Sequence, residues 1–134
     1  MRVVFTPWRL RYILGFKHGR PKGCFLCDAA KSPDKDGENL VLYRGDHAFI
    51  IMNRYPYNTG HLLVAPYRHV GDWTELTPEE RREIGELLAL AEEKLKSLLR
   101  PDGFNFGVNI GRVAGAGLPG HIHVHIVPRW AGDN

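Results

Sequence analysis

Residues 121–127 read HIHVHIV, in which imidazole side chains alternate strictly with β-branched ones. Alternation with period 2 is typical of a half-buried β-strand, because successive side chains of a strand point to opposite faces. We therefore expect a strand over 121–127, with His121, His123 and His125 on one face and the Ile and Val side chains packed into a core. Neighbouring imidazoles on such a face lie about 7 Å apart, close enough to act on one small group.

Three histidines in a row on one face can be interpreted in two ways from the residues alone. They can bind one metal ion, because imidazole suits zinc, copper, iron and nickel. Alternatively, one ring can attack a phosphorus atom while its neighbours donate hydrogen bonds to the phosphate oxygens. The preceding stretch AGAGLPG (residues 114–120) is turn-prone, and its backbone N–H groups could approach an anion closely. Arg129, which follows the histidines, would add a cation if it pointed inward.

The composition predicts one globular domain. The chain has 134 residues, of which 43% are hydrophobic and 25% charged, as in an ordinary soluble domain. We expect a single domain over 1–134, with an N-terminal arm over 1–23 and a core over 24–130. No run approaches the roughly 18 apolar residues of a membrane span, and the N-terminus does not resemble a signal peptide, so we expect a cytoplasmic protein.

The charge favours small anionic partners rather than nucleic acid. A net charge of +3 attracts anions in general. The basic residues are scattered along the chain, however, and no nucleic-acid-binding motif is evident. We therefore expect neither nucleic acid nor a membrane as a partner.

One long helix is predicted in the middle of the chain. Thr77 is a favourable N-cap, Pro78 occupies the first helical position, and Glu80 completes a capping box. Apolar residues at helical spacing extend the helix to about Leu99.

Most of the remaining pattern predicts short strands. They are expected over 40–43, 47–52, 61–66 and 104–110. The polar run over 32–39 is expected to be an exposed loop. Short turns between the strands favour antiparallel pairing, so the predicted fold class is α+β, with a mainly antiparallel sheet and one long helix.

Several motifs together resemble the histidine triad (HIT) family. GHIHVHIVPR over 120–129 is similar to the signature of that family, and NRYPYNTGH over 53–61 with PYRH over 66–69 resembles its nucleoside-binding strand-loop-strand. With the cysteine pair described below, the resemblance covers about residues 24–130. The segments PWR near the start and PRW with GD near the end are similar to the diadenosine tetraphosphate phosphorylases and their hydrolase relatives.

The resemblance implies nucleotidyl transfer from a dinucleoside polyphosphate through a covalent nucleotidyl-histidine, with His123 as the nucleophile. The residues that it implies in substrate binding are His125, Asn53, Asn109, Gly117 and His61. Of these, Asn53 matches a ribose contact, Asn109 a position near the phosphates, and His61 a histidine behind the triad.

The acceptor is expected to be phosphate rather than water. Hydrolases of the family typically carry a Gln four residues before the triad, where this chain has Gly117 and contains no Gln at all. Phosphorolysis is therefore favoured. The alternatives are a nucleotide hydrolase of the HIT type and a nucleotide-binding protein with little physiological turnover.

Cys24 and Cys27, the only cysteines, have the C-x-x-C spacing of metal or redox sites. In HIT proteins with this motif, a histidine after the third strand and the first triad histidine complete a structural zinc site. The resemblance thus implies zinc bound by Cys24, Cys27, His69 and His121. It also implies a homodimer, with Mg²⁺ as a possible companion of the nucleotide.

Three alternatives to this zinc site remain open from the sequence. The two cysteines can be a reduced pair in the core. All three triad histidines can share one catalytic ion. His47, which lies at the start of a predicted strand, is a spare candidate ligand.

Overall fold

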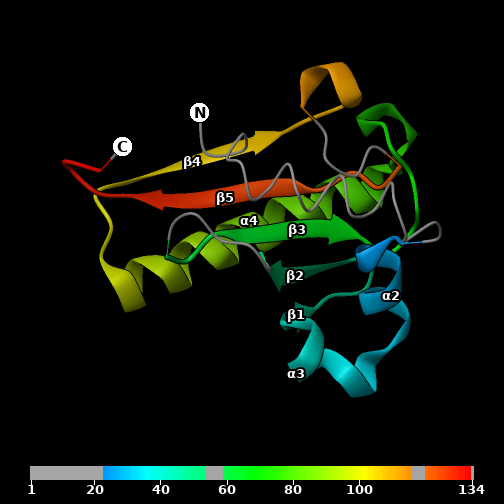
Figure 1. Ribbon diagram of the computed structural model, residues 1–134, viewed down its shortest axis with the longest axis horizontal. Helices are drawn as coiled ribbons and strands as arrows, with labels where there is room; N and C mark the ends of the chain where they lie inside the picture. The colour runs from blue at the N-terminus through cyan, green and yellow to red at the C-terminus, as the bar shows by residue number, and fades with distance from the viewer. Residues whose placement is uncertain (1–22, 54–58, 116–119, 134) are drawn as a thin grey trace.

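The computed structural model describes residues 23–53, 59–115 and 120–133, which form an α+β fold around a five-stranded sheet (Figure 1). The strands are β1 (Val41–Arg44), β2 (Ala48–Met52), β3 (Leu62–Pro66), β4 (Gly103–Val108) and β5 (Val124–Arg129). They lie in the order β1-β2-β3-β5-β4, and each neighbouring pair is antiparallel. The predicted fold class is confirmed. Residues 1–22 of the predicted N-terminal arm lie outside the described residues.

The long helix α4 (Pro78–Leu99) begins and ends where the sequence predicts. The Thr77 hydroxyl accepts a hydrogen bond from the Glu80 N–H at 3.0 Å, and the Glu80 carboxylate accepts one from the Thr77 N–H at 2.8 Å. This reciprocal capping box satisfies two N–H groups that would otherwise lack partners. At the other end, Arg100 adopts the left-handed conformation that terminates helices, directly before Pro101.

The helix α4 packs on one face of the sheet, and the short helix α2 (Phe25–Lys31) packs on the other face against β2 and β3 (Figure 1). The core under α4 consists of Ala48, Ile50, Leu62, Val64, Leu76, Ile84, Leu87, Ala91, Leu95, Ile122, Val124 and Ile126. The core under α2 consists of Leu26, Ala29, Phe49, Ile51, Leu63 and Ala65. Burial of these two apolar sets provides the main driving force for folding.

The predicted loop over 32–39 is wrong, because this segment forms the 3₁₀ turn η2 (Pro33–Lys35) and the helical turn α3 (Asp36–Asn39). The side chain of Arg44 explains why this segment is helical rather than an irregular loop. Its guanidinium binds the Asp36 carboxylate at 2.8 Å and also donates to the carbonyl oxygens of Ala29 and Ala30 at the end of α2. The hydrogen bonds from Arg44 lower the pKa of Asp36. One strand residue thereby fixes both helical segments beside β1.

The strand predicted over 121–127 is also shifted, because β5 spans 124–129. The backbone N–H of Ile122 donates to the carbonyl of Val70 at 2.7 Å, so this part of the chain bonds to the segment after β3 instead of joining the ladder. The predicted alternation still holds in space. Ile122, Val124 and Ile126 pack under α4.

Two further 3₁₀ turns connect the main elements, η3 (Trp73–Glu75) before α4 and η4 (Arg112–Ala114) after β4. Among the helices in the described part of the chain, none combines the length and the apolarity required to cross a bilayer.

Candidate functional site

Strand parity brings Asn53, His61 and His125 to the face of the sheet opposite α4. In the sheet register, Leu63 pairs with His125, Leu62 with Ile126, and Met52 with Leu62. His61 follows the same parity as Leu63 and is therefore a diagonal neighbour of His125 on one face, within reach of long side chains. The Asn53 N–H donates to the His61 carbonyl at 3.1 Å, which places the two residues side by side.

The three side chains form one continuous buried chain of hydrogen bonds. Asn53 Nδ2 lies 3.0 Å from His61 Nδ1, and His61 Nε2 lies 2.9 Å from His125 Nδ1. The relative exposures of Asn53, His61 and His125 are only 5%, 2% and 3%. Polar groups buried this deeply are costly unless they are hydrogen-bonded, so this arrangement constrains which nitrogen carries each proton.

His123 lies beside this chain, with its ring centroid 5.1 Å from that of His125 and the two ring planes at 63°. Its Nδ1 lies 2.9 Å from the backbone carbonyl oxygen of His121. Because a carbonyl can only accept, Nδ1 carries the proton, and in the neutral ring Nε2 carries the lone pair. An imidazole held in this tautomer is equipped for nucleophilic attack through Nε2.

A second cluster joins Cys24, Cys27, His69 and His121, whose ligand atoms all lie within 4.8 Å of one another. His121 Nδ1 lies 3.4 Å from each of the two sulfur atoms and 3.3 Å from His69 Nδ1. His69 Nδ1 lies 3.5 Å from Cys24 Sγ and 3.1 Å from Cys27 Sγ. The structure therefore brings together the four residues that the family resemblance implied as ligands.

The cluster has the dimensions and chemistry of a tetrahedral metal site. A zinc ion with two sulfur and two nitrogen ligands would separate the nitrogens by about 3.3 Å and each sulfur–nitrogen pair by about 3.6 Å. The measured N···N distance of 3.3 Å and S···N distances of 3.1–3.5 Å are close to these values. The four side chains can therefore hold a tetrahedral metal ion.

The protonation of the cluster is consistent with a bound cation. Burial lowers the pKa of His121, which keeps its ring neutral and able to ligate. The His121 Nε2–H donates to the Pro66 carbonyl at 2.8 Å, so Nδ1 carries the lone pair that faces the cysteines. Burial raises the pKa of the Cys24 thiol to about 12, so a cation is needed to convert this thiol to the thiolate near neutral pH.

Of the other candidate residues, two lie apart from these clusters and one is not among the described residues. Asn109 Nδ2 donates to the Ala114 carbonyl at 2.7 Å, which closes the η4 turn ahead of the glycine-rich stretch. Gly117 lies outside the described residues. His47 is exposed, and among the described residues it does not belong to the metal-binding group.

The expectation that Arg129 could face the phosphates is wrong. It ends β5, at the opposite end of the strand from His123, and its guanidinium binds the Asp133 carboxylate at 2.8 Å and Asn105 Oδ1 at 2.7 Å. Arg129 therefore fixes the turn after β5 and its contact with β4.

Two positions that shape the site were missed from the sequence. A Cβ atom on Gly120 would lie 2.7 Å from His69 Nε2, so only glycine leaves room for that ring. Arg68, the neighbour of His69, binds Glu80 at 2.7 and 2.8 Å, and this pairing lowers the pKa of Glu80 to about 2. The capping box of α4 thereby anchors the segment that carries His69. For Gly120, the available sequence signal was its place directly before the triad.

The paired histidine clusters and the order of the strands define a histidine triad protein. The model of the HIT domain family matches residues 35–132, and the chain belongs to this family. A protein of Mycobacterium tuberculosis named AP-4-A phosphorylase is 39% identical to it over 137 residues, covering 99% of this chain and 70% of that protein.

Solved structures agree with this assignment. A Zn-bound histidine triad family protein from Mycobacterium smegmatis has a TM-score of 0.72 and 28% identity, covering 84% of this chain and 78% of that one. A hypothetical histidine triad nucleotide-binding protein from Sulfolobus tokodaii has a TM-score of 0.71 and 31% identity, covering 82% and 71%.

Proposed function

We propose that this protein is an enzyme that transfers a nucleotidyl group from dinucleoside polyphosphates, such as diadenosine tetraphosphate, through a covalent intermediate on His123. The observation that carries the proposal is the 2.9 Å hydrogen bond from His123 Nδ1 to the His121 carbonyl, which places the lone pair on Nε2. The identity of 39% to a protein named AP-4-A phosphorylase supports the substrate class.

The first step is attack of His123 Nε2 on an α-phosphorus of the substrate. An N–P bond forms, and the bond from that phosphorus to the bridging oxygen breaks. With diadenosine tetraphosphate, ATP leaves and AMP remains on His123. The transition state spreads negative charge over the phosphoryl oxygens, so hydrogen-bond donors around them lower the barrier. We assign one such donor to His125, and we propose Asn53 as a ribose contact, Asn109 near the phosphates and His61 behind the triad.

In the second step the N–P bond breaks as an acceptor attacks the phosphorus. Gly117 offers no side chain to orient water, and the chain contains no Gln. Phosphate carries its own charge and can be held by backbone N–H groups of a glycine-rich turn. We therefore propose phosphate as the acceptor, which yields ADP from the bound AMP.

The acceptor is tested by product analysis. Diadenosine tetraphosphate incubated with the protein and inorganic phosphate is expected to yield ATP and ADP, resolved by chromatography at saturating substrate with phosphate varied. Gly117→Gln is expected to shift the products toward AMP, because the amide orients water and narrows the anion site. AMP with ATP at every phosphate concentration would identify a hydrolase, and no turnover would identify a nucleotide-binding protein.

We propose zinc as the ion of the Cys24, Cys27, His69 and His121 cluster. The S₂N₂ donor set and its tetrahedral dimensions support zinc, as does the Zn-bound relative from Mycobacterium smegmatis. The ion would hold the N-terminal end of α2 against the segments before β5 and after β3. Mg²⁺ is proposed only as a companion of the polyphosphate, whose oxygens are the ligands it prefers.

We propose that residues 24–130 fold as the core of a single cytoplasmic domain with residues 1–23 as an arm, and that two copies pair through β4. Two unoxidised cysteines in metal-binding positions support a reducing compartment.

Among the described residues, β4 has a strand partner on one side only, and it exposes Phe106 and Val108. An edge of this kind favours pairing with another chain.

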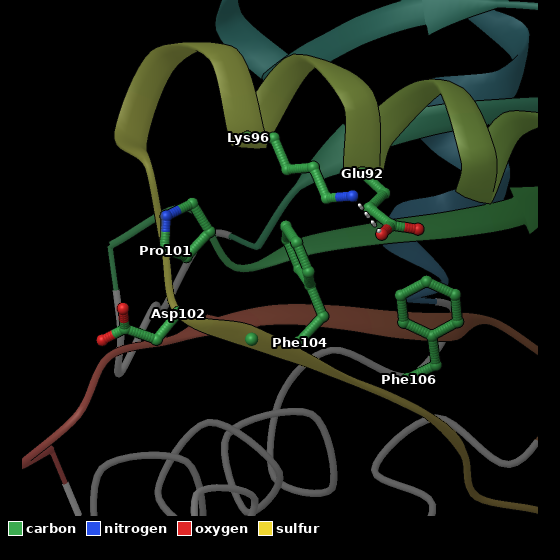
Figure 2. A pocket seen from close by; sticks show the side chains of 7 residues that line it. Glu92, Lys96, Pro101, Asp102, Phe104 and Phe106 are labelled. Atoms are coloured by element: carbon green, nitrogen blue, oxygen red, sulfur yellow. Dashed lines mark ion pairs between the residues drawn. The ribbon is translucent and has the colours of Figure 1, made fainter.

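A groove beside this edge supports pairing through β4. Figure 2 shows Phe104 and Phe106 of β4 pointing toward Glu92 and Lys96 of α4, which form an ion pair at 3.3 Å. The groove has a volume of about 440 Å³, and a second copy could place apolar side chains in it.

Phe106→Glu is expected to convert the proposed dimer to a monomer, because each copy would bury an unpaired carboxylate in the interface. Sedimentation velocity measures the change. Leu42→Glu is the matched control, since Leu42 has a similar exposure, 53% against 49%, and lies in β1 at the other edge of the sheet. A monomeric Leu42→Glu variant beside a dimeric Phe106→Glu variant would place the interface at β1 instead.

A further inference from the structure

We propose that Asn53 and His61 are positioning residues that set the tautomer of His125, and that this assigns opposite roles to the two neighbouring triad histidines. The inference rests on the proposed function, because it explains how His125 becomes a donor to the transferring phosphoryl group. It extends the role of Asn53 beyond the ribose contact that the family resemblance implied.

The argument begins at Asn53, whose amide nitrogen faces His61 Nδ1 at 3.0 Å. An amide NH₂ can only donate, so His61 Nδ1 accepts and the proton of the neutral ring resides on Nε2. His61 Nε2 lies 2.9 Å from His125 Nδ1. The Nε2–H therefore donates to His125 Nδ1, and the proton of a neutral His125 resides on its own Nε2.

His123 is held in the opposite state. Its Nδ1 donates to the His121 carbonyl at 2.9 Å, so the lone pair is on Nε2. Two rings whose centroids are only 5.1 Å apart thus present different atoms, a nucleophilic nitrogen on His123 and an N–H donor on His125. The Asn53–His61 chain favours the tautomer of His125 that presents an N–H, whereas the other tautomer would present a second lone pair to a negatively charged substrate.

Burial strengthens the control that these hydrogen bonds have over the tautomers. All three members are at least 95% buried, so water competes weakly for their hydrogen bonds. With the Asn53 amide nitrogen facing His61, a reversed chain would place two donors against each other, so reversal requires the amide to rotate and present its oxygen. The backbone hydrogen bond from Asn53 N–H to the His61 carbonyl, at 3.1 Å, holds the pair in register.

The direct test is the proton position on each ring of the ligand-free, metal-loaded protein. Long-range ¹H–¹⁵N NMR at about pH 8, where an ordinary histidine is neutral, is expected to show the proton on Nε2 of His61 and His125 and on Nδ1 of His123. A proton on Nδ1 of His61 or of His125 would overturn the proposal. This readout needs no substrate, so it stands or falls separately from the proposed activity.

Asn53→Leu separates a positioning role from a ribose contact. It removes the donor and keeps the branched shape of the side chain, so the NMR signals of His61 and His125 are expected to show mixed tautomers. With diadenosine tetraphosphate, kcat is expected to fall about 10- to 100-fold, with KM changed by less than about threefold. This is less than the roughly 10²- to 10³-fold loss for complete removal of one donor, because mixed tautomers retain part of the donor. A residue that contacts only ribose would raise KM and leave the ligand-free tautomers unchanged, which would overturn the proposal.

Met52→Leu is the matched control, because Met52 ends β2 directly before Asn53 and its side chain lies on the other face of the sheet. It is expected to leave both tautomers and kcat unchanged. Mixed tautomers in Met52→Leu would show that any disturbance of β2 suffices, and would also overturn a specific role for Asn53. If Asn53→Leu fails to fold, Asn53→Ser retains a polar group, and its weaker donor is expected to give an intermediate tautomer ratio.

Discussion

His123→Ala is expected to lower turnover of diadenosine tetraphosphate by about 10³-fold or more, with the fold unchanged. The substitution removes the attacking nitrogen, and covalent catalysis has no substitute route when the nucleophile is absent. His123 Nδ1 donates to the His121 carbonyl, and the segment that carries both residues is also held by the backbone hydrogen bond from Ile122 to Val70. Circular dichroism and the melting midpoint are therefore expected to stay close to those of the unmodified protein.

The covalent intermediate itself is measured by rapid quench. Brief incubation of the unmodified protein with substrate, followed by mass spectrometry under alkaline conditions, is expected to locate one AMP on His123. Phosphorus–nitrogen bonds to histidine are labile in acid, so an acid wash should remove the label. His47→Ala is the control, because His47 is an exposed histidine distant in sequence from the triad. A label on another residue, or full activity in His123→Ala, would contradict the mechanism.

The parts of the fold that depend on local sequence were predictable. The capping box at Thr77 and Glu80 and the apolar spacing that follows determine α4, and both are short-range signals. Strand parity likewise placed Ile122, Val124 and Ile126 in one core and the histidines elsewhere, because a period of 2 survives even where the hydrogen-bonded ladder ends.

The errors came from contacts between residues far apart in the sequence. The end of β5 near the triad depends on a backbone hydrogen bond from Ile122 to Val70, and the helical turns over 33–39 depend on Arg44. Neither partner leaves a signal in the local pattern. The charge of Arg129 suggested a contact with the phosphates if the side chain pointed inward, whereas it pairs with Asp133, four residues later.

The site shows the same division. The triad and the cysteine pair were visible as motifs, and the family resemblance supplied His69 and His121 as their companions. The orientation of each ring was not visible, because it depends on acceptors such as the carbonyls of Pro66 and His121 and on the amide of Asn53. Sequence therefore identified which side chains meet, and the structure is needed to say which nitrogen each one presents.

Cys24→Ser is expected to remove the metal and to lower the melting midpoint by about 10 °C or more, because the binding energy of a structural metal contributes directly to folding. Serine is a suitable replacement because it can keep the N-cap hydrogen bond of Cys24. Cys24 is the N-cap of α2, with its sulfur accepting the Cys27 N–H at 3.3 Å, and serine is a favourable N-cap. The cap is therefore retained and only the thiolate ligand is lost. Metal content is measured by mass spectrometry of the purified protein, with about one zinc per chain expected before substitution.

His123→Ala provides the comparison that decides between the two kinds of metal site. In the proposed site, Nδ1 of His121 faces the cysteines and His123 is not a ligand, so His123→Ala is expected to retain its zinc and its melting midpoint while losing activity. A catalytic ion held by all three triad histidines predicts the reverse pattern, with the metal lost in His123→Ala and retained in Cys24→Ser. Because Cys24 Sγ and Cys27 Sγ both lie 3.4 Å from His121 Nδ1, the expected result is loss of the metal from Cys24→Ser alone.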